Sequence, residues 1–198
     1  MFSHTLILIL ITVAISLLAL SNQKVLFRLI FWAPAIKERA QYDRFISYGF
    51  VHADGTHLLF NMITLFFFGS VMEKFFRQYC FDMGFVLFYL GGLIFSILPS
   101  YLKHRNDHQW SSLGASGAVS AVLFSYILFQ PWNKIYVFFI PVPAIIFAVL
   151  YIGYTIWSNQ RNNSNINHSA HLWGAAYGII ATIIIEPRVI PHFLNALL

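Results

Sequence analysis

Four polar side chains that could act together in catalysis stand at the heads of apolar stretches. Ser116 lies in "GASG", His171 in "AHLWGAAYG", and His57 and Asn61 in "HLLFN". His57 and Asn61 are four residues apart, so they share one face of a helix. Taken singly, a serine beside glycine is usually a packing residue, and a lone histidine is often interfacial. Their common setting favours a site, because ionisable groups within lipid are costly and tend to be functional.

The chemistry that these groups suit is acyl transfer by an activated serine. A serine hydroxyl becomes a nucleophile when a base within hydrogen-bond reach takes its proton, and His171, with a reference pKa of about 6.5, is a suitable base. Backbone N–H groups at the start of the helix that holds Ser116 favour an oxyanion. His57 and Asn61 can add side-chain donors. Since the helices contain no carboxylate beside these groups, we expect a Ser–His dyad.

The composition indicates a membrane protein. Of the 198 residues, 59% are hydrophobic and 10% are charged, whereas soluble domains carry about 25% charged residues. Six apolar blocks are each close to the ~20 residues that a spanning helix needs. They cover residues 5–20, 57–72, 81–102, 113–130, 135–157 and 170–185. We therefore predict an all-α, polytopic membrane protein with six transmembrane helices in a single domain, residues 1–198. Residues 21–56 mix aromatic, apolar and basic side chains, which is typical of an interfacial segment.

The order of the blocks brings the four polar side chains to one side of the membrane. Consecutive spanning helices alternate in direction, so the second, fourth and sixth begin on the same side. His57 and Asn61 open the second block, Ser116 the fourth and His171 the sixth. Their side chains therefore share a depth, whichever way the protein is inserted.

Small residues accompany these groups. Gly114 and Gly117 flank the serine, where they let a substrate carbonyl approach the backbone closely. Gly117 with Ala121, and Gly174 with Gly178, form two small-xxx-small patterns. Such patterns let helix backbones touch within lipid, so we expect the fourth and sixth helices to pack closely.

The three motifs, in this order at the heads of the second, fourth and sixth blocks, resemble the rhomboid intramembrane serine proteases over nearly the whole chain. The resemblance implies Ser116 as nucleophile and His171 as base. It implies His57 and Asn61 as oxyanion stabilisers together with the N–H of Ser116. It also implies cleavage of single-pass or multi-pass membrane proteins, within or beside their spanning helices.

Two further positions match the family, and one departs from it. Glu73 in "GSVMEK" is similar to the family's Gly-x-x-x-Glu stretch, and Arg44 to its first-loop arginine, although Asp43 precedes it where the family has tryptophan. The family usually has a tyrosine four residues after the serine, beneath the histidine ring. Here that position is Ser120, so the sequence leaves open what holds the ring of His171.

Partners and alternatives follow from the same residues. The net charge is +5, and most basic residues flank apolar blocks, so we expect the lipid bilayer rather than nucleic acid as the partner. We predict no cofactor and no metal site. One alternative is a rhomboid-like pseudoprotease that binds membrane helices without cutting them. Another is a haem- or metal-binding membrane protein that uses His57 and His171, which leaves Ser116 and Asn61 unexplained.

Two observations on the sequence imply opposite orientations of the protein in the membrane. The resemblance implies a cytoplasmic N-terminus, a bacterial-type inner membrane and an active site that faces outward. In that orientation, eight Lys and Arg residues lie outside and four inside, whereas the positive-inside rule favours the reverse. Five of the eight lie in the 21–56 segment. Because that segment reads as structured and interfacial, we expect the orientation that the resemblance implies.

Overall fold

Helices account for most of the chain. The computed structural model describes residues 3–137, 139–161 and 167–198. In chain order its elements are α1 (His4–Ser21), α2 (Gln23–Leu29), α3 (Ala33–Arg39), α4 (Arg44–Ser47), η1 (Tyr48–Phe50), α5 (Gly55–Thr64), η2 (Leu65–Gly69), α6 (Ser70–Tyr79), α7 (Gly84–His104), α8 (Ser116–Phe129), β1 (Lys134–Val137), β2 (Ile140–Pro143), α9 (Ala144–Arg161), α10 (His168–Ile185) and α11 (Val189–Leu197).

Four helices among the described residues are long and apolar enough to cross a membrane. They are α1, the continuous helix Gly55–Tyr79 formed by α5, η2 and α6, then α7 and α10. The helix α8 is apolar but shorter, at 14 residues. The prediction of a helical membrane protein is thereby confirmed; among the described residues, four of the six predicted spans meet this criterion.

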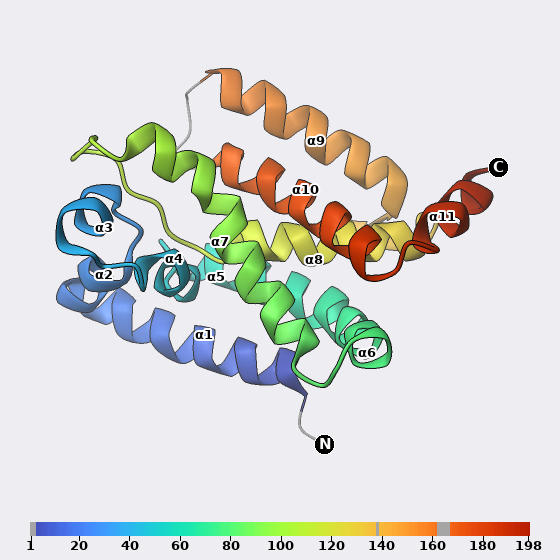
Figure 1. Cartoon of the computed structure of the whole chain (residues 1–198), viewed down its shortest axis with the longest axis horizontal. Helices are drawn as coiled ribbons and strands as arrows, with labels where there is room; N and C mark the ends of the chain where they lie inside the picture. The colour runs from blue at the N-terminus through green and yellow to red at the C-terminus, as the bar shows by residue number, and fades with distance from the viewer. Residues whose placement is uncertain (1–2, 138, 162–166) are drawn as a thin grey trace.

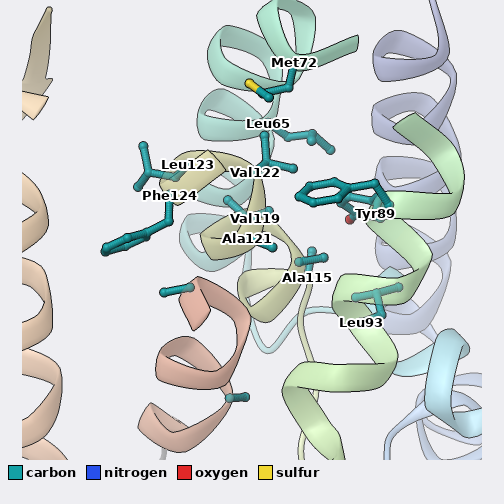
Figure 2. Close-up of a cluster of buried hydrophobic side chains, with 14 of the residues drawn as sticks. Leu65, Met72, Tyr89, Leu93, Ala115, Val119, Ala121, Val122, Leu123 and Phe124 are labelled. Atoms are coloured by element: carbon teal, nitrogen blue, oxygen red, sulfur yellow. The ribbon is translucent and has the colours of Figure 1, made fainter. Parts of the chain in front are cut away.

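The short helix α8 lies at the centre of the bundle, with α1 and α9 towards opposite edges (Figure 1). Every residue from Gly117 to Ile127 is buried, as expected of a helix that is apolar on all sides. Figure 2 shows Val119 and Val122 of α8 in a cluster with Leu65 of η2 and Tyr89 of α7. Because its neighbours enclose it, α8 holds whatever its first turn carries in a fixed place.

Glycines let α8 and α10 approach one another closely. A methyl group added to Gly174 would lie 2.1 Å from the carbonyl oxygen of Gly117. One added to Gly178 would lie 2.2 Å from that of Ala121. The two small-xxx-small patterns, one on α8 and one on α10, therefore pack against each other. This contact fixes the starts of the two helices relative to each other.

The carboxylate of Glu73 in α6 caps the N-terminus of α1. It accepts hydrogen bonds from the backbone N–H of His4 and of Thr5, both at 2.9 Å, and from the hydroxyls of Ser3 and Thr5, both at 2.7 Å. A carboxylate is favourable here because the first N–H groups of a helix lack intrahelical partners and its dipole is positive at this end. Glu73 thus ties the first span to the second.

Residues 21–56 are structured, as predicted, and Arg44 holds their chain path. The guanidinium of Arg44 is buried and donates to the carbonyl oxygens of Phe27, at 3.1 Å, and Ile30, and to the Gln41 side chain at 2.7 Å. Burial lowers the pKa of Arg44 below its ordinary value. Asp43, which precedes it, instead pairs with Arg28 at 2.7 Å.

The helix limits differ from the prediction by three or more residues in four blocks. The fifth is the largest difference: helix α9 begins at Ala144, and the residues before it form an antiparallel hairpin in which Lys134 pairs with Pro143. The predicted start at residue 135 was wrong because Pro141 and Pro143 lack the N–H that a helix interior needs, whereas an edge strand tolerates them. The second block runs on to residue 79, the third begins at residue 84, and the fourth begins at Ser116.

Candidate active site

The first turns of α8 and α10 bring Ser116 and His171 into contact. The Nε2 atom of His171 lies 2.8 Å from the Oγ atom of Ser116. That distance is within the range of a hydrogen bond through which a base takes a proton from a nucleophile. The contact depends on the close packing of Gly174 against Gly117. Gly174 lies three residues after His171, and Gly117 lies one residue after Ser116.

The pair opens onto a cavity of about 1040 Å³. Its walls come from α5, α8, α9 and α10, and from the segment 109–114 that leads into α8. The side chains that line it include His57, Asn61, Ser116, Tyr151 and His171. All four polar side chains that the sequence singles out therefore face one space.

The turn before Ser116 requires glycine. Gly114 has φ +107°, a backbone conformation that side-chain-bearing residues rarely adopt. Its N–H donates to the Tyr48 carbonyl oxygen at 2.9 Å. A Cβ atom at this position would lie 2.6 Å from the Cε1 atom of His57. The absence of a side chain at Gly114 is what lets the His57 ring lie against the loop beside the nucleophile.

Asn61 faces the cavity one turn after His57. It is 7% exposed, and its side-chain amide donates to the His57 carbonyl oxygen at 2.9 Å. The carboxylate of Asp54 caps the same helix by accepting the His57 N–H at 2.8 Å. One amide hydrogen of Asn61 is thus used within the helix, and the second can serve a bound group.

A buried histidine, which our sequence reasoning missed, supports the loop. His52 is fully buried, and its Nδ1 atom lies 2.9 Å from the Ser16 hydroxyl. That hydroxyl donates to the Phe50 carbonyl oxygen at 2.8 Å, so it accepts from Nδ1–H. The Nε2 atom of His52 is then free to accept the N–H of Ala115, at 3.4 Å. His52 thereby links α1 to the residue that precedes the serine.

The environment of His52 keeps its ring neutral. Burial, reinforced by the neighbouring His57 ring, lowers the pKa of His52 to about 3, although Asp54 opposes the shift. The centroids of the two rings are 4.9 Å apart. His52 lies outside the apolar blocks, so block position gave no signal; its place five residues before His57 in "HADGTH" was the available hint.

A tyrosine from α9, also missed from the sequence, faces the ring of His171. The ring centroids of Tyr151 and His171 are 6.1 Å apart and their planes are 15° from parallel. The Tyr151 hydroxyl lies 2.6 Å from the Oγ atom of Ser120. Tyr151 stands in the middle of an apolar helix, where its ring reads as a core residue, and only the serine at position 120 hinted that an aromatic group must come from elsewhere.

The carboxylate of Asp54 borders the cavity, where it caps α5. Among the described residues, no carboxylate forms an ion pair with His171, and no group of three or more His, Cys, Asp or Glu side chains is placed to hold a metal ion. The groups that the sequence singles out at this cavity are the hydroxyl of Ser116, the imidazoles of His57 and His171 and the amide of Asn61.

A family model described as the rhomboid domain matches residues 39–188. This range contains the helices that line the cavity and all four polar side chains that face it. It also contains Arg44 and Glu73.

Individual relatives cover much of the same range. The Arabidopsis thaliana protein named "RHOMBOID-like protein 12, mitochondrial" is 37% identical over 149 residues, which are 69% of this chain and 44% of that protein. A rhomboid protease of Providencia stuartii is 25% identical over 73% of this chain and 56% of its own length. One of Haemophilus influenzae is 26% identical over 74% of this chain and 72% of its own. The chain thus spans about half the length of the first two.

These relatives bear on location. The four apolar helices and the family match place the protein in a membrane as an integral protein. The bacterial inner membrane expected from the sequence has no support among them, since one relative is a plant protein whose name includes "mitochondrial".

Proposed function

Because the chain belongs to the rhomboid family, we propose that it is an intramembrane serine endopeptidase that works through a dyad of Ser116 and His171. The observation that carries the proposal is the 2.8 Å contact between His171 Nε2 and Ser116 Oγ at the edge of a cavity that His57 and Asn61 also line. Relatives named rhomboid proteases support the class of activity.

The dyad acts as nucleophile and general base. His171 carries its proton on Nδ1, so Nε2 accepts the hydroxyl proton as Ser116 Oγ attacks the carbonyl carbon of the substrate peptide bond. The imidazolium then gives that proton to the leaving amine. Water, activated by the same imidazole, hydrolyses the acyl-enzyme and restores both groups.

The oxyanion is stabilised at the first turn of α8. The N–H of Ser116 has no intrahelical partner because the helix begins there. His57 and Asn61 reach the same space from α5, and each can donate one hydrogen bond. Donors fixed before the reaction stabilise developing charge without reorganising, which is the largest contribution in many enzymes of this type.

We further propose that the helices form one domain with six spans, α8 and α9 being the fourth and fifth. A 14-residue helix rises about 21 Å, short of the ~30 Å hydrocarbon core. Since α8 begins at the nucleophile, Ser116 then lies below the membrane surface. The cavity reaches Ser116 from the side on which α5 and α10 begin, where polar side chains such as Asp54, Gln109 and Asn167 line it, so water and substrate can enter from that side.

The substrates that fit such a site are spanning segments of single-pass or multi-pass membrane proteins. A peptide bond in an intact helix is hydrogen-bonded and surrounded by side chains, so the segment must unwind before attack. Gly or Pro near the cut lowers the cost of unwinding, by about 1 and 3 kcal/mol respectively.

The test uses the purified full chain in detergent. A fluorophosphonate probe should label the wild-type protein at Ser116, and a single-pass model protein should be cut. Ser116→Ala and His171→Ala should each lose both activities while remaining folded, and the double variant should be no worse than either, because the two groups act as one unit.

The control is Ser125→Ala, which removes another buried hydroxyl of α8, one that bonds Thr182 away from the cavity. It should retain labelling. A folded wild-type protein that neither labels nor cuts, yet still binds the model protein, would instead be a pseudoprotease. Full activity in Ser116→Ala or His171→Ala would reject the dyad.

A further inference from the structure

We propose that Tyr151 of α9 is a positioning residue that holds the imidazole ring of His171 in the orientation from which Nε2 reaches Ser116. The inference rests on the function proposed above and names a component of the site that lies on a different helix from both dyad members.

The ring of Tyr151 is fixed at its far end by α8. Ser120 lies one turn after Ser116, is 4% exposed, and its hydroxyl is 2.6 Å from that of Tyr151. The aromatic ring of Tyr151 is half-buried, and it also packs against Phe124 of α8, with centroids 5.6 Å apart. A phenol anchored by its hydroxyl and packed along its edge has little freedom to rotate, so it presents a fixed face.

That face lies against His171. The two ring planes are 15° from parallel with centroids 6.1 Å apart, an offset arrangement within the favourable range for aromatic pairs. Among the described residues, His171 also has a ring contact with His168, whose plane is tilted by 71° at 6.0 Å. Tyr151 therefore supplies the near-parallel face, which limits rotation of the imidazole about its Cβ–Cγ bond.

The limit matters because the imidazole also borders open space. His171 borders a cavity of about 1040 Å³, into which an unsupported ring can swing between rotamers. Proton transfer needs Nε2 within about 2.6–3.2 Å of the hydroxyl. A misplacement of about 1 Å can cost on the order of 100-fold in rate, so loss of the supporting face reduces turnover rather than binding.

The experiment compares Tyr151→Ala and Tyr151→Phe with Tyr154→Ala, a matched loss of a tyrosine from the same helix that contacts His168 but not His171. Fluorophosphonate labelling of the full chain in detergent measures serine reactivity. We expect a roughly 10- to 100-fold slower rate in Tyr151→Ala. Tyr151→Phe, which keeps the ring and loses one hydrogen bond, should be about 2- to 10-fold slower. Tyr154→Ala should label like the wild type.

Moving the tyrosine ring from position 151 to position 120 distinguishes an effect on the placement of His171 from an effect on overall stability. Ser120 and Tyr151 meet at their hydroxyls, so a tyrosine at position 120 can fill, from α8, the space that Tyr151→Ala empties. The double variant Ser120→Tyr, Tyr151→Ala should therefore regain at least half of the lost labelling rate. With a cleavable substrate, Tyr151→Ala should lower kcat and leave KM within about threefold.

A readout independent of proteolysis is carbethoxylation of His171 by diethyl pyrocarbonate, followed by mass spectrometry. Tyr151→Ala should accelerate it because the ring loses its cover. If the wild type does not react with fluorophosphonate, the proposed function fails, and this measurement still decides the contact. Should Tyr151→Ala fail to fold, Tyr151→Leu, which keeps most of the volume without the aromatic face, takes its place. The inference is overturned if the variant is labelled and carbethoxylated at the same rates as the wild type. It is also overturned if the variant changes KM while kcat stays constant.

Discussion

The Nε2 atom of His171 lies 2.8 Å from the hydroxyl of Ser116, although 55 positions separate the two residues in the chain. The distance is set by backbone contact: Gly174 and Gly178 lie directly against α8 with no side chain between the helices. Because neither helix can shift along the other without a clash, the relative depth of nucleophile and base is a property of the helix interface rather than of the two side chains.

The side-chain oxyanion donors should affect turnover more than serine reactivity. We expect His57→Ala and Asn61→Ala each to lower kcat by about 10²-fold, the lower end of the range for one lost donor, because the N–H of Ser116 remains. Fluorophosphonate labelling should persist at a reduced rate. Steady-state cleavage of a model single-pass protein, together with labelling, measures both effects.

Thr64→Val is the control for these two variants. Thr64 lines the same cavity from the same helix, and its hydroxyl bonds the Phe60 carbonyl oxygen at 2.8 Å. The Thr64→Val variant should keep kcat within about threefold of the wild type, because this hydroxyl takes no part in the reaction. Unchanged kcat in both His57→Ala and Asn61→Ala would remove these residues from the site.

Gly114→Ala should damage the active site and its stability together. The change places a side chain at φ +107° and 2.6 Å from the His57 ring. Backbone strain of this kind costs on the order of 1–3 kcal/mol, and the displaced ring loses its place beside Ser116. We expect slower labelling and a lower unfolding temperature. Gly55→Ala is the matched control, since a Cβ atom there meets nothing within 4 Å; equal behaviour of the two variants contradicts the prediction.

What the sequence could predict was the placement of side chains by helix order. Ser116 and His171 head alternate apolar blocks, and alternation of direction is enough to bring such residues to one side. The glycine pairs of α8 and α10 carry the helix packing in their spacing alone. These features are local, periodic or topological, so they can be inferred from the sequence without knowing any distance in the structure.

What the sequence could not predict was contact between residues with no shared pattern. Tyr151 reaches His171 only because α9 starts after a hairpin, at Ala144. The apolar run from residue 135 did not indicate where the helix starts, and so did not indicate where Tyr151 lies along it. His52 has the same difficulty, because its partner Ser16 lies on a helix 36 positions away. Side-chain pairs of this kind depend on helix rotation, which composition and spacing leave undetermined.

His52 should make stability fall with acid. Its pKa is lowered from an ordinary 6.5 to about 3 in the folded chain, so folding favours the neutral ring. The stabilisation is therefore complete above pH 6.5 and is lost as pH falls towards 3, by up to 1.36 kcal/mol per pH unit for one proton, on the order of 4 kcal/mol in all.

The measurement compares the wild type with His52→Gln, whose amide can bond Ser16 and Ala115 but does not titrate. Unfolding free energies in detergent are taken from pH 7 to pH 4. The wild type should lose stability faster than the variant over this interval, by roughly 1 kcal/mol per pH unit. Parallel profiles would show that His52 does not remain neutral in the folded chain.

The orientation of the chain can be tested through its single cysteine. Cys80 is exposed and lies between α6 and α7, at the end of the second span opposite to His57. In the expected orientation Cys80 faces the cytoplasm. In intact bacterial cells that express the chain, a membrane-impermeant thiol reagent should leave it unlabelled until the membrane is opened. Partial desolvation by neighbouring atoms raises the pKa of the exposed Cys80 thiol, so labelling is run at mildly alkaline pH.

A second cysteine on the active-site side turns this result into a positive test. Asn106 is exposed in the segment between α7 and α8, so Asn106→Cys in a Cys80→Ser background should label in intact cells. The charge distribution argues for the reverse, with eight Lys and Arg on the outer segments against four on the inner ones. Five of those eight lie in the structured segment 21–56. Without that segment the count is three against four, which favours neither orientation. Labelling of Cys80 but not of position 106 in intact cells would invert the protein and carry Ser116 and His171 to the cytoplasmic face with it.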